Sequence, residues 1–261
     1  MTAILTAVTI SVLTLWLVAE RFRPAFQRSG GVRRIFRNIG LGVAGTLTTF
    51  LVVTPVSLAA AQVGPGWRGD WPLALRLGAD LVVLELFIYW WHRALHEVSA
   101  LWRFHRVHHY DTFLDVTSAL RFHPGEMVIS AFLRGTLIVL FDVSVLAILL
   151  FDAFVIIAAG FHHSNISLPR RIDDRLRRVI VSPRHHRIHH IPEQQYTDSN
   201  YGTLLTVWDR LFRSYQDPET VGSYGVAGHR DKPLPRLMTD PFRNQRDPDD
   251  DRNPTPPENL R

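Results

Sequence analysis

Residues 73–96 read LALRLGADLVVLELFIYWWHRALH, an apolar stretch from Leu73 to Trp91 that runs directly into His92 and His96. At a rise of 1.5 Å per residue, a helix over Leu73–Trp91 is roughly 28 Å long, close to the hydrocarbon thickness of a bilayer. It ends in Tyr-Trp-Trp, the kind of aromatic belt found at membrane–water interfaces. This stretch therefore predicts a membrane-spanning helix that brings two histidines to a membrane surface.

Three other apolar stretches accompany it, namely Thr2–Ala19, Ile39–Val63 and Val128–Phe161. Thr2–Ala19 has no basic residues before it and no small-residue cleavage site after it, so we interpret it as a retained span. Val128–Phe161 is interrupted by charged residues, which favours a helical hairpin, shallow or re-entrant, over one straight span. The sequence predicts an all-α integral membrane protein, a transmembrane helical bundle of three spans plus a helical hairpin.

The loop from Glu20 to Asn38 sets the expected orientation. It contains six arginines and one acidic residue, and an excess of basic residues marks the cytoplasmic side of a membrane. The N-terminus then starts outside, and the helix over Leu73–Trp91 crosses inward. We therefore expect the histidines to form a helical cap on the cytoplasmic face. The arginine-rich, lysine-poor composition suggests a bacterial inner membrane.

Composition excludes several kinds of site. The chain has no cysteine, which rules out disulfides, cysteine-ligated zinc, iron–sulfur clusters and thiol nucleophiles. Its formal net charge is +5, but no polybasic block resembles a nucleic-acid patch, and we expect no nucleic-acid partner. Twelve of the 13 histidines lie between His92 and His190, so any metal would be held by nitrogen or oxygen.

The histidines are grouped in repeated patterns. His92 and His96 form H-x3-H, and two H-x2-HH motifs follow, at His105-Arg-Val-His108-His109 and at His186-Arg-Ile-His189-His190. On a helix, residues three or four apart share a face. We expect the first and second histidines of each H-x2-HH motif to share one ion and the third to reach a neighbouring ion. Eight patterned imidazoles exceed the needs of one metal and predict two.

Imidazole suits zinc, copper, iron and nickel, whereas calcium and magnesium prefer oxygen. His96-Glu97 does not continue as the H-E-x-x-H of a zinc hydrolase. A cluster of this size beside a bilayer favours a two-metal redox centre with two iron ions, although zinc can occupy purified samples.

The order of these motifs resembles the fatty acid hydroxylase and sterol desaturase superfamily. The distal H-x2-HH is followed by Asn200-Tyr-Gly202 and by Trp208-Asp-Arg-Leu-Phe212, and the resemblance covers roughly Leu73 to Phe242. It implies an oxidoreductase, a membrane-bound monooxygenase or desaturase with a histidine-held, non-haem di-iron site. Such an enzyme uses O2 to hydroxylate or desaturate a fatty acyl, sterol or related lipid. Three domains follow: membrane spans at 1–72, a fatty acid hydroxylase-like catalytic domain at 73–242, and a disordered polar tail at 243–261.

The resemblance also implies a ligand set. His123, in Phe122-His-Pro124, matches a His-Pro of the family and joins the set as a tenth member, while His162 and His185 are extra neighbours and His229 lies in a polar surface loop. The expected ligands are His92, His96, His105, His108, His109, His123, His163, His186, His189 and His190.

Other polar residues are candidates to orient the histidine rings. Asn165, Asp209, Asp115 and Glu126 are such candidates, each weighed against a capping or surface role. Glu85 lies seven residues before His92, on the same helical face and deeper in the membrane, where an ionisable group is costly and usually functional.

We expect charged residues inside the apolar stretches to form ion pairs. The alternative reading of Glu85 is a buried carboxylate paired with an arginine such as Arg134. Arg76 and Asp80 lie four residues apart, and we expect them to pair with each other.

The expected partners are a lipid that enters from the bilayer and a separate electron donor such as a ferredoxin, cytochrome or reductase. The donor is needed because the chain has no cysteine cluster and no apparent haem or dinucleotide-binding domain. A carotenoid hydroxylase and an ether-lipid monooxygenase stay open as alternatives with the same chemistry. So does a non-catalytic membrane protein that binds metal or haem. The oligomeric state is open.

Overall fold

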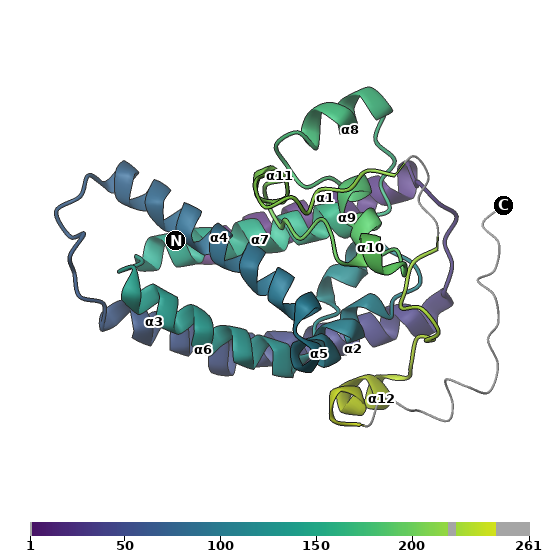
Figure 1. Cartoon of the computed structure of the whole chain (residues 1–261), viewed down its shortest axis with the longest axis horizontal. Helices are drawn as coiled ribbons and strands as arrows, with labels where there is room; N and C mark the ends of the chain where they lie inside the picture. Colours follow the sequence, from purple (N-terminus) through teal and green to yellow (C-terminus); the bar gives the residue numbers. More distant parts are fainter. Residues whose placement is uncertain (1, 219–222, 244–261) are drawn as a thin grey trace.

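The computed structural model describes residues 2–218 and 223–243, and the regular structure in these ranges is helical apart from two isolated β-bridges. Long helices form the body of the molecule, and most of the short ones gather at one end of it (Figure 1). The long elements are α1 (Thr2–Phe22), α2 (Gly31–Thr48), α4 (Leu73–Glu97), α6 (Pro124–Leu140) and α7 (Val145–His163). The short ones are η1 (Thr49–Val53), α3 (Thr54–Gln62), α5 (Ser99–His109), η2 (Val116–Leu120), α8 (Arg170–Leu176), α9 (Pro183–His189), α10 (Gln194–Thr197), α11 (Val207–Leu211), α12 (Leu234–Thr239) and η3 (Asp240–Phe242).

Three helical stretches are long and apolar enough to cross a membrane: α1, the continuous stretch Gly31–Gln62 built from α2, η1 and α3, and α7. The π-helical turn η1 comes just before Pro55, whose ring cannot donate a backbone hydrogen bond and crowds the preceding turn. A wider turn at this point lets the helix continue. The expected span Leu73–Trp91 lies within α4 but does not qualify, because charged residues interrupt it. The count of three spans is reached instead through α7, which we expected only as half of the hairpin.

The outer faces of the long helices are apolar. Large hydrophobic side chains such as Ile10, Phe36, Phe50, Phe132 and Phe154 are exposed. On a water-soluble protein such a surface is costly, whereas in a bilayer it faces lipid. The exposed side chains therefore mark the membrane-facing side of the bundle.

The helices alternate in direction, so the chain segments separate into two ends (Figure 1). The loop between α1 and α2, together with α5, α9 and α10, lies at one end, and the loop 63–72 and the α6–α7 connection lie at the other. The arginine-rich loop and the histidine-bearing helices therefore share one end of the bundle. This arrangement agrees with an even number of crossings between the first and last histidines.

The stretch Val128–Phe161 folds as two antiparallel helices, α6 and α7, that diverge from their connection (Figure 1). α6 packs on α2 and α3, whereas α7 packs on α1 and α4. Ser144 caps α7 by accepting a hydrogen bond from the Ala147 N–H, and a serine at this position is a strong helix start. The two helices thus form an open hairpin whose arms rest on different partners.

One buried and one partly exposed ion pair stabilise the end opposite the histidines. Arg68 contacts Asp80 at 2.7 Å, and Arg76 contacts Asp142 at 3.4 Å. The prediction that Arg76 and Asp80 pair with each other is therefore wrong. The start of α4 packs against the α6–α7 connection, so each residue takes a partner from another segment in place of its neighbour one turn away.

α2 contains the spacing Gly40-x-Gly42-x-x-Gly45, which a dinucleotide-binding turn also uses. Such a turn follows a strand and opens a helix, whereas these glycines lie inside α2. A Cβ on Gly40 would lie 2.4 Å from Leu234, and one on Gly42 would lie 3.0 Å from Leu120. The glycines here permit close packing and do not indicate a nucleotide site.

The core of the bundle lies where α4 meets the hairpin. Leu84, Ile138, Ala147, Ile148 and Phe151 are fully or nearly fully buried there and pack together. Inside a membrane, close van der Waals packing of such side chains stabilises the contacts between helices, because burial there does not remove them from water. This cluster holds α4 against both hairpin helices. The expected polar tail at 243–261 lies, beyond Arg243, outside the described residues.

Candidate metal centre

Four helices deliver the histidines to one place. α4 supplies His92 and His96 at its end, α5 supplies the first H-x2-HH motif, α7 ends at His163, and α9 carries the second H-x2-HH motif. α9 begins at Pro183, which is well suited to a first helical turn, and the Ser182 hydroxyl accepts from the His185 N–H. The sequence thus starts a short helix just before its histidines.

Nine of the ten expected ligands form two compact groups, and in each group the candidate ligand atoms lie within 4.8 Å of one another. All nine side chains are buried. Group one contains His92, His96, His105, His109 and His189. Group two contains His108, His163, His186 and His190. The groups touch, since the His109 and His190 rings stack at 4.3 Å.

Within each H-x2-HH motif, the first and third histidines share a group and the second joins the other one. His105 and His109 belong to group one while His108 belongs to group two; His186 and His190 belong to group two while His189 belongs to group one. Our expectation had the second and third histidines the other way round. On a helix, residues four apart differ by about 40° and residues three apart by about 60° in the opposite sense. The i+3 side chain therefore turns toward the neighbouring group.

Group two has the spacing of ligands around an ion. The Nε2 atoms of His163 and His108 lie 3.0 Å apart, those of His186 and His163 lie 2.9 Å apart, and those of His190 and His186 lie 3.1 Å apart. Ligands at right angles around an ion at about 2.1 Å are separated by about 3 Å. Several ring nitrogens converging at this spacing fit a bound metal.

Group one presents nitrogens that lack other partners. The Nε2 atoms of His96, His105, His109 and His189 are buried and have no hydrogen-bond partner among the described residues. Buried polar atoms are rarely left unsatisfied, and an ion is one ordinary explanation. The donor set here is all imidazole, which suits iron, zinc, copper or nickel.

The opposite nitrogens of several rings are held by the surrounding backbone. His92 Nδ1 lies 2.8 Å from the Tyr201 carbonyl, His189 Nδ1 lies 2.7 Å from the Ser199 carbonyl, and His163 Nδ1 lies 2.8 Å from the Ala159 carbonyl. A carbonyl only accepts, so Nδ1 donates and Nε2 is left as a free ligand. His105 Nδ1 makes the same kind of contact to Glu126 Oε2 at 3.1 Å.

The environment keeps several of the histidine rings neutral. Burial, and then the surrounding imidazoles, hold the pKa of each ring on α5 and α9 named here well below its usual value: His108, His109, His186, His189 and His190. A metal binds only the neutral ring. The fold therefore presents these rings in the unprotonated form that a metal binds.

The structure does not bring His123 to either group. Its Nδ1 accepts from the Gly125 N–H at the start of α6, and its Nε2 lies 3.1 Å from the Met238 carbonyl. Both ring nitrogens are used, so the histidine of Phe122-His-Pro124 acts as a helix cap here.

The remaining histidines also lie outside both groups. The His162 ring packs 4.1 Å from that of His186, and His185 Nε2 lies 3.1 Å from Asp209 Oδ2. His229 stacks on Tyr110.

Among the expected orienting residues, Asp209 lies next to a ring of group one. It accepts from the N–H groups of Tyr201 at 2.7 Å and Gly202 at 3.0 Å, and from the Ser214 hydroxyl at 2.7 Å. Because the Tyr201 carbonyl in turn accepts from His92, Asp209 holds the loop that orients a ring of group one. The motif Asn200-Tyr-Gly202 marks this loop in the sequence. It does not reveal the contact with His92, which depends on how the chain packs.

Glu85 and Asn165 hold loops that lie farther from the histidine rings. Glu85 accepts from the Leu205 N–H at 2.7 Å. It is not paired with Arg134, which contacts Asp152. The Asn165 side chain both accepts from and donates to the backbone of Phe26. Neither side chain reaches the histidine rings directly.

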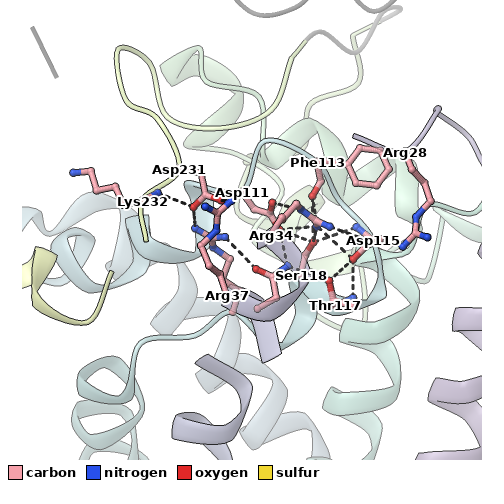
Figure 2. Close-up of polar contacts among 12 residues, drawn as sticks. Arg28, Arg34, Arg37, Asp111, Phe113, Asp115, Thr117, Ser118, Asp231 and Lys232 are labelled. Carbon is pink, nitrogen blue, oxygen red and sulfur yellow. Dashed lines mark hydrogen bonds and ion pairs between the residues drawn. The ribbon is translucent and has the colours of Figure 1, made fainter. Parts of the chain in front are cut away.

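A buried arginine cluster supports the end of α5. Figure 2 shows the Arg34 guanidinium enclosed by Asp111, Asp115, Ser118 and the Phe113 carbonyl. Arg34 is 2% exposed, and its Nε lies 2.5 Å from Asp111 Oδ1. In the sequence, Arg34 stands out only as one arginine of a basic loop, because its acidic partners lie far along the chain.

A cavity of about 250 Å³ reaches the histidines from within the bundle. It lies between α4, α6 and α7, and α4 lines it with Phe87, Ile88, Trp91 and Leu95. At one part of its wall lie histidines of both groups, namely His92, His105, His108, His163 and His186, together with His162. An apolar space thus meets both candidate ligand groups.

Apolar helices of membrane length with two adjoining histidine groups define the class: a helical membrane protein with a histidine cluster that could hold metal. More specifically, the chain belongs to the fatty acid hydroxylase family, whose sequence model matches residues 78–214. No solved structure gives a significant match.

Three relatives place the chain within this family. It is 28% identical to ornithine lipid hydroxylase OlsE of Rhizobium tropici, over 76% of this chain and 60% of that protein. It is 30% identical to alkylglycerol monooxygenase of Danio rerio, over 62% of this chain and 34% of that protein. It is 26% identical to human lathosterol oxidase, over 62% of this chain and 52% of that protein. The chain therefore spans between a third and three fifths of the length of these relatives.

Proposed function

We propose that this chain is a membrane-bound, O2-dependent lipid hydroxylase or desaturase that holds two iron ions in its histidine groups. The observation that carries the proposal is the apolar cavity whose wall includes histidines of both groups. A water-filled cleft would suit a polar substrate, whereas this space between long apolar helices suits a hydrocarbon chain. Family membership and three lipid-acting relatives support the same reaction class.

The residues of this chain have separate roles in that proposal. Nine histidines would hold the ions, five of them in group one and four in group two. The Tyr201, Ser199 and Ala159 carbonyls fix which ring nitrogen faces inward. The apolar wall positions a C–H bond and keeps water away. Iron supplies the redox chemistry with O2 that such a bond requires.

The overall reaction requires an electron donor. In hydroxylation, one oxygen atom of O2 enters the C–H bond and the other leaves as water, with two electrons and two protons consumed. We assign the electrons to a separate ferredoxin, cytochrome or reductase. The substrate enters from the bilayer, and the site faces the cytoplasm of a bacterial inner membrane.

The experiment begins with purified protein loaded with iron and reduced without oxygen. Addition of O2 with a lipid extract is expected to give O2 uptake matched by an oxygenated or desaturated lipid. Ornithine lipids, alkylglycerols and sterols, which the names of the relatives mention or imply, are the first candidates. Comparison of lipids from cells with and without the chain names the substrate directly. Bound iron that reacts with no lipid under these conditions contradicts the proposal.

Metal storage and haem binding fit the geometry less well. A storage protein has no need of an apolar cavity at its metal site. A haem held between two histidines needs an open slot for its macrocycle, whereas the nine rings here lie in contact with one another. The cavity and the close packing of the rings favour the oxygenase.

A further inference from the structure

A polar stripe crosses the otherwise apolar cavity. Glu126, Ser130 and Arg134 follow one another at intervals of four residues along α6, and all three line the cavity. Residues at this spacing lie on one helix face. Asp152 of α7 lines the same cavity and contacts Arg134 Nη1 at 2.8 Å. The stripe therefore runs from the metal centre, where Glu126 contacts His105, to an ion pair between the hairpin helices.

Arg134 has hydrogen-bonding capacity that its partner does not use. Its side chain is 11% exposed, and its Nε and Nη2 atoms are buried with no hydrogen-bond partner among the described residues. Buried polar atoms without a hydrogen-bond partner are expensive to keep among apolar side chains. A lone structural pair would be better served by apolar residues of similar size. Arg134 lines the cavity, so a ligand that packs against its guanidinium and brings a hydrogen-bond acceptor would satisfy the unused donors.

The charges define the kind of group that these donors accept. Asp152 already compensates the guanidinium charge, so an anion brought to Arg134 would also meet the carboxylate. An uncharged oxygen, such as an ester, amide or ketone carbonyl, accepts hydrogen bonds without that repulsion. The pair thus presents donors while adding no net charge to the cavity.

The position of the pair sets a distance to the metal centre. Arg134 lies eight residues from Glu126 and Asp152 lies eleven from His163, which corresponds to about 12 and 16 Å along the two helices. An extended hydrocarbon advances about 1.25 Å per carbon with C–C bonds near 1.5 Å. A carbonyl at Arg134 would place a carbon about ten to thirteen positions away beside the histidines.

We propose that Arg134, held by Asp152, is a specificity-determining residue that binds an uncharged carbonyl oxygen of the lipid and so fixes which carbon is oxidised. This inference rests on the proposed lipid oxygenase function and names its substrate class: an acyl lipid with a neutral carbonyl about ten to thirteen carbons from the reacting position.

The first test measures binding without turnover. Iron-loaded protein in detergent is offered a long-chain lipid with one internal ketone, in competition with the analogue that has a methylene in its place, and bound lipid is measured by native mass spectrometry. A charge-assisted hydrogen bond corresponds to roughly a 10- to 100-fold preference. We expect that preference in the wild-type protein and its loss in Arg134→Met.

Two further variants separate recognition from stability. Arg134→Met/Asp152→Met removes both charges and leaves no unpaired carboxylate, and it should also bind the two lipids equally. Arg76→Met removes an ion pair with Asp142 of the same hairpin, but Arg76 does not line the cavity. It should keep the preference. Iron content and thermal unfolding confirm that each variant is folded.

The second test follows the oxidised position. In a series of ketone lipids with the carbonyl at different positions, wild-type protein should oxidise a carbon at a constant distance from the carbonyl, and the Arg134 variants should lose that constancy. Equal binding of ketone and methylene lipids by wild-type protein, or a preference that persists in the double variant, overturns the inference. A preference without any product contradicts the proposed function and leaves the binding site standing. Formation of product without a preference for the ketone lipid supports the proposed function and contradicts the role of Arg134.

Discussion

Arg34 of α2 forms a buried, two-point ion pair with Asp111, the second residue after His109. Its Nη1 also contacts Asp115 at 2.8 Å. Arg34→Met would leave both carboxylates buried without their main partner, and loss of one member of such a cluster costs about 3–5 kcal/mol. We expect a clear fall in thermal stability and in iron content, since the end of α5 carries His108 and His109. Thermal unfolding and metal analysis in detergent measure both.

Arg33 provides a matched control, because it is exposed on the preceding position of the same helix. Arg33→Met should leave both quantities unchanged. Arg34→Lys keeps the charge but loses the planar fork, so partial rescue is expected. An Arg34→Met protein with the stability and iron content of wild type would show that the cluster does not support the metal centre.

In each H-x2-HH motif, the second histidine lies in a different group from the first and third. This arrangement predicts which ion each variant loses. His108→Ala should weaken the site of group two, and His189→Ala should weaken the site of group one, although each residue is the second histidine of its motif. Each variant should retain about half the iron of wild type after dialysis against a chelator, and the double variant should retain little. Metal analysis by mass spectrometry measures the stoichiometry.

His123→Ala serves as the control for the ligand assignment. His123 caps α6 and contacts the Met238 carbonyl, so its loss should lower stability by about 1 kcal/mol, as for other helix caps, and leave iron content unchanged. If His123→Ala loses as much iron as His108→Ala, the nine-residue ligand set is incomplete.

The depressed pKa values of His108, His109, His186, His189 and His190 make the metal-free protein sensitive to acid. Below the unfolded histidine pKa of about 6.5, the unfolded chain takes up protons that the folded chain refuses. The free energy of unfolding therefore falls as pH falls, by up to about 1.4 kcal/mol per pH unit for each such group. Thermal unfolding between pH 7.5 and 5.5 should show this loss.

Iron provides the comparison for the same experiment. Bound metal competes with protons for the same nitrogens, so iron-loaded protein should keep its stability to lower pH and then lose iron and stability together. Equal stability of the metal-free protein at pH 7.5 and 5.5 would mean that these rings take up protons freely in the fold.

Local patterns in the sequence were enough to predict the features that depend on neighbouring residues. The spacing of the histidines indicated that they gather into a cluster that could hold metal, and the apolar stretches indicated a helical membrane protein. The same local rule failed for Arg76 and Asp80, whose partners Asp142 and Arg68 come from other segments. His123 matched a family motif, yet its ring nitrogens are used by the start of α6 and by Met238. Contacts of this kind depend on packing that spacing does not encode.

Asp209 tests how much a residue outside the ligand groups contributes to them. Asp209→Asn removes the charge from a carboxylate that accepts from Tyr201, Gly202 and Ser214. The loop that holds His92 should loosen, and loss of such a supporting contact typically lowers metal affinity 10- to 100-fold. Titration with a competing chelator measures the change. Asp217→Asn, which affects a partly exposed pair with Arg177, should not alter it; equal effects of the two variants would reduce Asp209 to a general stabilising role.

The two ends of the bundle can be assigned to the two sides of the membrane because the chain has no cysteine. Ser29 lies in the arginine-rich loop at the histidine end, and Asp70 lies in the loop at the opposite end; both are exposed. If the histidine end faces the cytoplasm, a membrane-impermeant maleimide should label Asp70→Cys in intact spheroplasts and Ser29→Cys only after lysis. The reverse pattern would place the metal centre on the outer face, where cytoplasmic ferredoxins and reductases could not reach it. The proposed source of electrons would then fail together with the orientation.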